Sequence, residues 1–413
     1  MKIAIIGSGI SGLSAAYFLS KKYKVDLFEK NKHFGGHSYT EEIYIDNEDK
    51  SISVDLGFIV FNKITYPNLV NFFNELNVPF EKSNMSFSVS VKNSNIEYSG
   101  NGMQGLFCNK KNIFNLNFLK MIKEIIFFYR DARTIDIKKC EKETLGEFLK
   151  SKGMSKFFIN FHIVPMVAAI WSMPEKLAEK IPMTLFLNFF RNHGLLKLKD
   201  RPQWYTVSGR SKIYVEKILK KISGECYKNY EIKSVFRNDR NVRLYYGESN
   251  EYFDYDQVVF ASHANETLRL IQNPTEEENK ILSNFEYKNN IAYLHTDNNF
   301  MPQRKKAWSS WNSILDNEDA NKTCLTYWLN KLQNLKTKNN YFLTLNPITK
   351  IEESKIIKKI NFTHPFYDQK VIDGQKNLYR LQGVKNSWFC GSYFGYGFHE
   401  DGLKSALNIV NLI

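Results

Sequence analysis

Three glycines near the start of the chain have the spacing of a dinucleotide-binding loop. Gly7, Gly9 and Gly12 follow a short apolar run and precede a helical pattern. In such a loop the first glycine permits a tight turn, the second lets a pyrophosphate approach the backbone, and the third lets helix and strand pack closely. Ile10 and Ser11 would begin the helix and offer free N–H groups to the phosphates. The spacing therefore predicts a dinucleotide site.

An acidic residue stands where a ribose-binding group is expected. Glu29 ends a second apolar run and lies 17 residues after Gly12. Its carboxylate can accept hydrogen bonds from a ribose hydroxyl. Lys30 follows it and is a further candidate for cofactor binding. The order of strand, glycine loop, helix, strand and acid predicts a βαβ unit at the start of the chain.

A second glycine pair, Gly35–Gly36, follows the acid and is itself followed by His37. The pair resembles the second flavin motif of the amine oxidase and phytoene desaturase-like superfamily, where the loop runs beneath the FAD pyrophosphate. This resemblance implies that the dinucleotide is FAD and includes His37 among the binding residues. A plain Gly-Gly turn is the alternative interpretation.

The end of the chain resembles the C-terminal flavin motif of the same superfamily. A short apolar strand, Trp388–Cys390, is followed by Gly391 and Ser392, and a helix begins around Gly402 and Leu403. In the superfamily this helix points its N-terminus at the isoalloxazine and stabilises negative charge on reduced flavin. An ordinary closing strand and helix is the alternative. A strand cysteine before Gly391 should point into packing, so we expect the FAD to be bound non-covalently.

The order of the segments predicts two discontinuous domains in an α/β protein: a Rossmann-like FAD-binding domain (GR2-type) and an α+β substrate domain. The resemblance also lays a strand like Ile232–Phe236 along the adenine, which would put Val235 there. The FAD-binding domain is expected over residues 1–60, 204–264 and 388–413, and the substrate-binding domain over 61–203 and 265–387.

Candidate catalytic residues are few, because flavin chemistry needs neither a metal nor a triad when the protein holds the reactants in line. His399 and Glu400 lie in the loop expected at the isoalloxazine, and His193 lies between two polar or small residues. A hydrogen-bonded structural role is the alternative for each. No metal site is expected. A set of aromatic residues is expected either to line an apolar cleft or to form core: Phe186, Phe189, Phe190, Trp204, Trp308, Trp311 and Trp328.

Five further strings are similar to a bacterial family of predicted NAD/FAD-binding proteins, often encoded beside cyclopropane-fatty-acid-synthase-like enzymes. The similarity covers essentially the whole chain and implies a flavoenzyme of the amine oxidase fold, with lipid acyl chains as an expected substrate. One departure is Tyr393, where many relatives carry an acid that binds the ribityl chain. The strings are Met85–Ser90, Trp171–Pro174, Phe189–Leu196, Arg201–Gly209 and Gly395–Gly402.

The leading functional hypothesis is an FAD-dependent oxidoreductase, a desaturase or dehydrogenase of an apolar substrate such as a modified fatty acyl chain. A redox-neutral double-bond isomerase is the first alternative. Amine oxidation ranks lower, because the lysine and paired aromatic residues of several amine oxidases cannot be placed. An escort-like lipid carrier is the non-enzymatic alternative, and the intact glycine motifs argue against it.

Composition limits the other possibilities. The 413 residues are 43% hydrophobic with a net charge of +14, but the lysines are dispersed and no nucleic-acid motif is present. Five scattered cysteines and a strand that starts at residue 2 favour a cytoplasmic protein without a signal peptide. The pattern over Ile113–Tyr129 predicts a basic amphipathic helix. It could lie on the inner membrane face or pack on the core, and both interpretations stay open.

Overall fold

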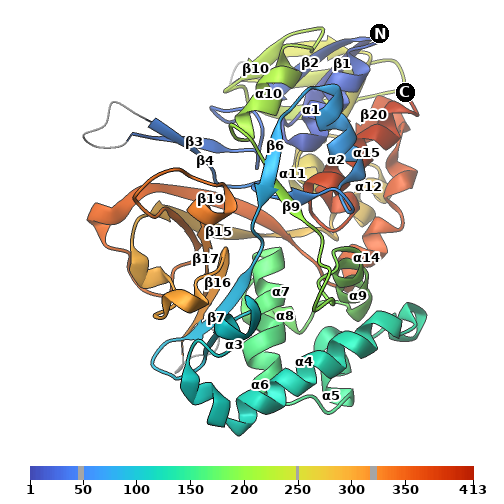
Figure 1. Cartoon of the computed structure of the whole chain (residues 1–413). Coiled ribbons are helices and arrows are strands. Elements are labelled where there is room, and N and C mark those ends of the chain that lie inside the picture. Colours follow the sequence, from blue (N-terminus) through green and yellow to red (C-terminus); the bar gives the residue numbers. More distant parts are fainter. Residues whose placement is uncertain (45–50, 248–250, 317–322) are drawn as a thin grey trace.

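The computed structural model describes residues 1–44, 51–247, 251–316 and 323–413. Both termini lie in the upper part of Figure 1, beside a parallel sheet, and a group of helices lies at the opposite end of the molecule. A second, larger sheet lies between them on one side. The predicted α/β architecture is confirmed.

The first sheet has five parallel strands in the order β10, β2, β1, β14, β20. These strands come from residues 2–29, 226–260 and 387–389, so three distant parts of the chain build one sheet. The domain boundaries themselves stay a prediction. The strands are β1 (Lys2–Ile6), β2 (Lys24–Glu29), β10 (Cys226–Lys228), β14 (Gln257–Phe260) and β20 (Ser387–Phe389).

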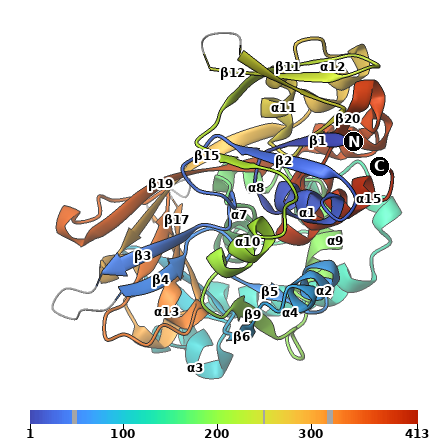
Figure 2. The ribbon, with the colours of Figure 1, turned by 90° about the horizontal axis from the view of Figure 1, so that it is seen from above.

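Apolar side chains cover both faces of this sheet, as expected for parallel strands. Ile3 and Ile5 of β1 pack with helices α1 and α15 on one face, while Ala4 and Ile6 point into the core on the other face. A small antiparallel sheet covers that second face (Figure 2). The bounds are α1 (Ile10–Leu19), α10 (Lys212–Leu219), α15 (His399–Val410), β11 (Ile232–Arg237), β12 (Val242–Tyr246) and β13 (Glu251–Tyr255).

The second large sheet has seven strands in the order β19, β15, β18, β17, β16, β7, β8. All neighbours are antiparallel except the pair β7 and β16. Its longest strand, β19, ends at Phe366. The strands are β7 (Phe87–Val91), β8 (Glu97–Ser99), β15 (Glu286–His295), β16 (Trp311–Leu315), β17 (Thr323–Trp328), β18 (Phe342–Leu345) and β19 (Ile356–Phe366).

The helices at the end opposite the parallel sheet pack around one hydrophobic core. The helix expected over 113–129 is α4, which begins at Leu116 because the Asn115 side chain accepts a hydrogen bond from the Phe118 N–H (3.1 Å). A π-helical turn, Ile159–Ile163, precedes α7. The main helices are α4 (Leu116–Thr134), α5 (Leu145–Ser151), α6 (Lys156–Phe158), α7 (Val164–Trp171), α8 (Glu175–Ala178) and α9 (Met183–Asn192).

The other elements connect these layers. Strand β9 lies between β5 and β6 and so ties the residues after 203 to the expected substrate region. These connecting elements are α2 (Pro67–Glu75), α3 (Gly102–Leu106), α11 (Ala264–Leu270), α12 (Glu276–Leu282), α13 (Leu329–Leu332), α14 (Gln369–Gln375), β3 (Thr40–Tyr44), β4 (Ser51–Asp55), β5 (Phe61–Asn62), β6 (Phe80–Ser83) and β9 (Trp204–Val207). Within the described residues, no helix has the length and apolar character needed to cross a bilayer.

Candidate functional site

A cavity of about 910 Å³ runs from the glycine loop into the second domain. Ligand sites of this size are common in proteins. The chain has eight histidines, and seven of them line this cavity. They are His33, His37, His162, His193, His263, His364 and His399. Such a concentration of histidine in one cavity points to chemistry or to ligand binding.

The first glycine loop has the geometry that a pyrophosphate site requires. Gly7 has φ +102°, and a Cβ there would lie 2.8 Å from the Ala261 carbonyl oxygen. A Cβ at Gly12 would lie 1.9 Å from the Gly7 oxygen, so helix and strand touch at this point. Gly9 differs, because a Cβ there would meet nothing within 4 Å and the residue lines the cavity. The backbone at Gly9 therefore faces open space large enough for a phosphate.

The second glycine pair lies directly against the first loop. A Cβ at Gly36 would lie 3.0 Å from the Gly9 Cα, and the Gly35 N–H donates to Ser8 Oγ (3.1 Å). His37 follows and is half-buried, and its Nε2 is buried with no hydrogen-bond partner among the described residues. Burial lowers the pKa of His37 well below its usual value, so the ring is neutral. An unpaired polar atom beside the loop fits a bound ligand such as the FAD pyrophosphate.

Glu29 is buried at the end of β2 and fixes the loop through its carboxylate. One oxygen accepts hydrogen bonds from Ser8 N (3.1 Å) and Ser8 Oγ (2.6 Å), and the other accepts from Asn31 N (2.8 Å). Asn31 Nδ2 also donates to this second oxygen (2.7 Å), so each oxygen already accepts two hydrogen bonds and a ribose hydroxyl would have to replace one of these donors. Lys30 also lines the cavity, and its Nζ lies 2.7 Å from Glu266 Oε1.

The C-terminal segment closes the same site. Gly391 and Ser392 line the cavity, whereas Gly402 and Leu403 pack behind it. A Cβ at Gly402 would lie 2.7 Å from Ser11 Oγ, so the starts of α15 and α1 abut. Two helix N-termini therefore meet beside the cavity, which favours a ligand with negative charge.

Several predicted cofactor residues support the cavity without lining it. Gly12, Gly35, Gly402 and Leu403 belong to this group. Val235 does so too, because β11 reaches the cavity only at its beginning, through Ile232 and the two residues before it. The Val235 carbonyl instead accepts a hydrogen bond from Gln272 N (3.0 Å). Val235 therefore lies behind the cavity, Ile232 is the residue of β11 that lines it, and the adenine contact at Val235 stays a prediction.

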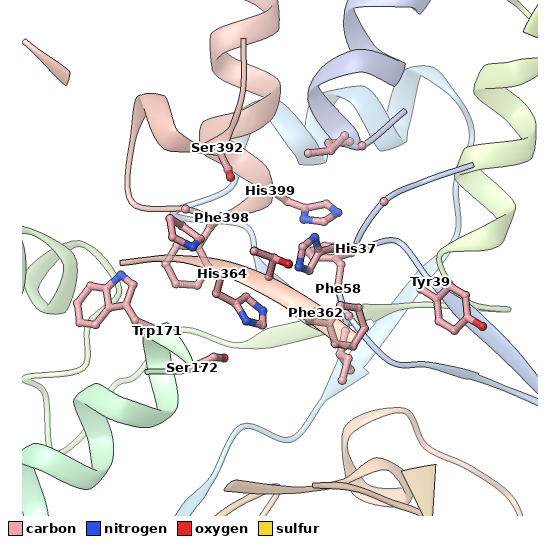
Figure 3. Close-up of a pocket in the computed structure, with 18 of the residues that line it drawn as sticks. His37, Tyr39, Phe58, Trp171, Ser172, Phe362, His364, Ser392, Phe398 and His399 are labelled. Carbon is pink, nitrogen blue, oxygen red and sulfur yellow. The ribbon is translucent and has the colours of Figure 1, made fainter. Parts of the chain in front are cut away.

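His399 is held rigidly at the start of α15. Its ring stacks on Phe58 with centroids 3.7 Å apart, and its Nε2 lies 3.1 Å from both Ser38 Oγ and Tyr214 OH. Burial lowers the pKa of His399 to about 3. Figure 3 shows His399 and His37 facing the same space. His399 is therefore a neutral hydrogen-bonding group at the cavity wall.

Glu400 does not line the cavity, contrary to its expected catalytic place. Its carboxylate accepts hydrogen bonds from Asn68 N (3.0 Å), Asn68 Nδ2 (2.7 Å) and Leu69 N (3.0 Å). It thus satisfies the free N–H groups at the start of α2, which is a structural role. Sequence adjacency to His399 could not distinguish these roles, because successive helical residues point in different directions.

His193 lies at the end of α9 and lines the cavity, stacked on Phe189 with centroids 3.9 Å apart. Its Nδ1 donates to the Phe189 carbonyl oxygen (3.0 Å). Burial lowers the pKa of His193 to about 4, so the neutral ring carries its proton on Nδ1. Its Nε2 is therefore a free acceptor for a proton.

His364, which the sequence did not single out, has the opposite tautomer. Ile291 N–H donates to Asn346 Oδ1 (3.0 Å), Asn346 Nδ2 donates to Asn290 Oδ1 (2.6 Å), and Asn290 Nδ2 donates to His364 Nδ1 (2.8 Å). Burial lowers the pKa of His364 to about 4, so its only proton lies on Nε2. The one sequence signal was its spacing of two from Phe362, which puts both on one face of β19.

The part of the cavity in the second domain is largely apolar. Of the seven expected aromatic residues, Phe189, Trp204 and Trp311 line it. Phe186 and Phe190 are buried in the core, while Trp308 and Trp328 pack on each other outside it. Trp171 and Phe398 also line the cavity and complete the aromatic wall (Figure 3). No group of residues suited to holding a metal ion occurs in the described chain.

Comparisons with known proteins agree with this geometry. Residues 5–76 match the model of the NAD(P)-binding Rossmann-like domain. A stretch of 67 residues is 39% identical to protoporphyrinogen oxidase of Dictyostelium discoideum, but it covers only 14% of this chain and 13% of that protein.

Whole-chain similarity is seen with solved structures. A redesigned putrescine oxidase superposes with TM-score 0.71 and 12% identity, covering 99% of this chain and 98% of that one. A fatty acid isomerase from P. acnes, described as producing CLA, superposes with TM-score 0.68 and 12% identity, covering 100% of this chain and 98% of that one. Cyclohexylamine oxidase from Brevibacterium oxydans superposes with TM-score 0.68 and 12% identity, covering 100% of this chain and 99% of that one.

These matches define the class of protein. The chain has the fold of the flavin-containing amine oxidase superfamily, as the two flavin-like motifs predicted, and it begins with a Rossmann-like dinucleotide-binding domain. At this level of identity the fold alone is established, and the substrate must be inferred from the cavity.

Proposed function

We propose that the protein is an FAD-dependent oxidoreductase that removes two hydrogens from an apolar substrate such as a modified fatty acyl chain. The observation that carries this proposal is that one continuous cavity joins the glycine loops to an apolar chamber. Bound FAD supplies a hydride acceptor to such a site. The chain supplies the binding groups of the two loops and an aromatic wall that excludes water.

His193 and His364 provide the proton-handling groups of this proposal. The free Nε2 of His193 would accept the proton that leaves with the hydride, so that one hydride and one proton leave the substrate together. His364, with its Nε2–H, would donate a hydrogen bond. General-base assistance of this kind contributes about 10²–10⁴-fold to a rate.

Replacing His193 with asparagine tests this role. The amide Nδ2 of His193→Asn can still donate to the Phe189 carbonyl but offers no base in place of Nε2. We expect kcat to fall about 10²–10⁴-fold, with flavin content and melting temperature unchanged. Rates are measured by single-turnover flavin reduction. His33→Asn, which changes a more exposed histidine of the same cavity, is the matched control. A retained rate in His193→Asn would exclude His193 as the base.

A redox-neutral isomerase is the second candidate, and the two histidines favour it in one respect. A double-bond shift requires one site that takes a proton and one that returns it, and His193 and His364 have opposite tautomers. Product mass separates the two functions. Loss of two hydrogens supports the desaturase, and unchanged mass supports the isomerase.

Amine oxidation and lipid carriage are less well supported. Among the described residues that line the cavity the only lysine is Lys30, at the glycine-loop end, so no lysine reaches the apolar chamber. An escort-like carrier would have no use for the open backbone at Gly9. Purification of the protein with the yellow colour and absorbance bands of flavin is the first test. A colourless protein that FAD does not reconstitute would refute the proposed function.

A further inference from the structure

The charged residues that line the cavity divide into two unequal groups. Five lie at the glycine-loop end, where a dinucleotide would bind. The sixth is Arg201, from the loop between α9 and β9. Within the described lining, it is the only charged side chain from residues 61–203, and this part of the expected substrate domain contributes no carboxylate. Glu266 and Arg269 of α11 belong to the later part of that domain, and Glu266 pairs with Lys30 beside the glycine loop. The five are Glu29, Lys30, Glu231, Glu266 and Arg269.

Arg201 has no anionic partner among the residues that the structure describes. Its Nε donates to the Lys197 carbonyl oxygen (2.7 Å), and none of the ion pairs among the described residues involves it. The side chain is exposed and yet lines the cavity, so the cavity reaches solvent beside it. The next residue, Pro202, packs against Gly194 and helps to fix this loop. A positive charge with unused N–H donors therefore stands at an opening of an apolar chamber.

The buried groups near Arg201 do not neutralise it. Tyr98 OH donates to the Phe161 carbonyl oxygen (2.7 Å), so it accepts from His162 Nδ1–H (3.0 Å), and Tyr129 OH donates to His162 Nε2 (2.9 Å). Burial, and then the charge of Arg201, lower the pKa of His162 to about 3. This Tyr–His–Tyr network is uncharged and fully hydrogen-bonded, so Arg201 keeps its charge for a ligand.

Helix α7 gives the direction in which a ligand would extend. His162, from the π-helical turn before α7, and Met166 and Ile170 of α7 all line the cavity, so one side of this helical segment forms its wall. At its other end Trp171 Nε1 donates to the Tyr396 carbonyl oxygen (3.3 Å), in the C-terminal motif. The seven steps of α7 from Val164 to Trp171 rise about 10 Å along the helix. The apolar wall therefore leads from the region of Arg201 to the C-terminal motif.

We propose that the substrate carries one anionic end group, a carboxylate or a phosphate, which Arg201 binds while the apolar chain follows α7 into the chamber. This inference rests on the proposed function and specifies its substrate class. The reacting carbon then lies well inside the chain, remote from the charged end.

Calorimetric titration of the FAD-loaded protein with oleate, methyl oleate, oleylamine and oleoyl lysophosphatidate tests the inference without requiring turnover. We expect oleate or the lysophosphatidate to bind at least about tenfold more tightly than the ester and the amine, because only the two anions form a charged hydrogen bond with Arg201. Which of the two anions binds better distinguishes a carboxylate from a phosphate. Equal affinity for all four ligands would overturn the inference.

Variants at Arg201 make the test specific. Arg201→Gln should remove the preference for the anion, and Arg201→Lys should retain part of it, because lysine keeps the charge but not the planar fork. Lys199→Gln removes the same charge from the same loop at a residue outside the cavity lining and should leave the preference intact. An equal effect of Arg201→Gln and Lys199→Gln would refute a specific site. Failure of the protein to bind FAD would instead refute the proposed function.

A separate surface carries a second inference. The 3₁₀ turn Lys110–Phe114 and the outer face of α4 expose large apolar side chains, which we call the α4 apolar surface: Ile113, Phe114, Leu116, Ile126 and Phe127. Phe114 is 86% and Leu116 is 81% exposed. In Figure 1 helix α4 lies at the end of the molecule opposite the parallel sheet.

The charges around this surface are positive. Exposed basic residues accompany it, whereas the acids of α4 are engaged elsewhere. Glu124 accepts hydrogen bonds from Ser155 N (2.9 Å) and Ser155 Oγ, and Asp131 lies 3.5 Å from Lys152 Nζ. An apolar surface ringed by cations is complementary to an anionic bilayer. The basic residues are Lys110, Lys111, Lys120, Lys123 and Arg130.

We infer that the α4 apolar surface docks on an anionic membrane. Wild-type protein should sediment with vesicles of phosphatidylcholine and phosphatidylglycerol and much less with phosphatidylcholine alone. Phe114→Ser with Leu116→Ser should lose this binding, whereas Tyr379→Ser with Leu412→Ser, at exposed sites elsewhere, should keep it. Unchanged binding by the first variant would overturn the inference. The inference would also be overturned if size-exclusion chromatography showed that the wild type is a dimer and the first variant is not, because a second copy of the chain would then cover the α4 apolar surface.

Discussion

Replacing Gly9 with valine is expected to abolish flavin binding and leave the fold intact. Gly9 has φ −64° at the start of α1, which any residue adopts, and its Cβ would meet no protein atom within 4 Å. The added side chain would instead occupy the cavity where the pyrophosphate is expected. We expect FAD affinity to fall at least about a hundredfold, or ~2.7 kcal/mol.

Flavin content after purification and titration of the apoprotein with FAD measure this effect. The melting temperature of the variant apoprotein should match that of the wild-type apoprotein. Gly100→Val is the control, because the nearest atom to a Cβ there is 4.0 Å away and the site lies far from the glycine loops in sequence. A Gly9→Val protein that still binds FAD tightly would show that the ligand does not lie on this loop. If the Gly9→Val protein lost flavin but still bound lipid, this result would support the escort-like carrier instead of the enzyme.

The two ends of the chain were readable from sequence because local physics determines them. Gly7 and Gly12 must be glycine for reasons of turn geometry and close packing, and the structure gives both reasons. Such requirements act within a few residues, so spacing alone reveals them. The helix after Gly391 was predicted in the same way, from local spacing. It begins at His399, a few residues before the expected start around Gly402. The Asp401 carboxylate in its first turn accepts hydrogen bonds from the backbone N–H groups of Tyr396 and Phe398 (3.0 Å each).

The functional tautomers could not be predicted from sequence. The proton position on His364 depends on a chain of two asparagines that ends at a backbone N–H, contributed by β15 and the loop after β18. Arg201 was noticed only as part of a string, because its lack of a partner is a property of the folded cavity. Glu400 was misplaced for the same reason, since its partners at Asn68 and Leu69 are more than 300 residues away in sequence.

A buried ion pair holds together the strands that complete the first domain. Arg237 of β11 and Glu278 of α12 are fully buried and form two hydrogen bonds of 2.7 and 2.8 Å, and Arg237 also donates to Ser387 Oγ of β20 (3.1 Å). Burial alone would raise the pKa of Glu278, but the bonds from Arg237 and from Thr275 N–H outweigh it and hold the pKa below its usual value. The pair therefore links β11, α12 and β20.

Replacing Arg237 with methionine should lower the free energy of unfolding by about 3–5 kcal/mol, because Glu278 is left buried without its partner. Adding Glu278→Leu should restore much of the loss, since an apolar pair of similar size has no charge to desolvate. Chemical denaturation of the two single variants and the double variant measures the coupling. Arg243→Met, which breaks the exposed pair with Asp254, is the control and should change stability little.

The pH dependence of stability in a further variant, Glu278→Gln, tests the sign of this pKa shift. Because the folded pKa of Glu278 is depressed, its contribution is present above the unfolded pKa and is lost as pH falls through the folded value. The difference in stability between wild type and Glu278→Gln should therefore shrink as the solution is acidified below about pH 4.

Flavin release should follow the unfolding of Arg237→Met, because β20 leads directly to Gly391 and Ser392 at the cavity. Flavin that stays with the protein after that unfolding would show that it is attached covalently, against the expectation for Cys390.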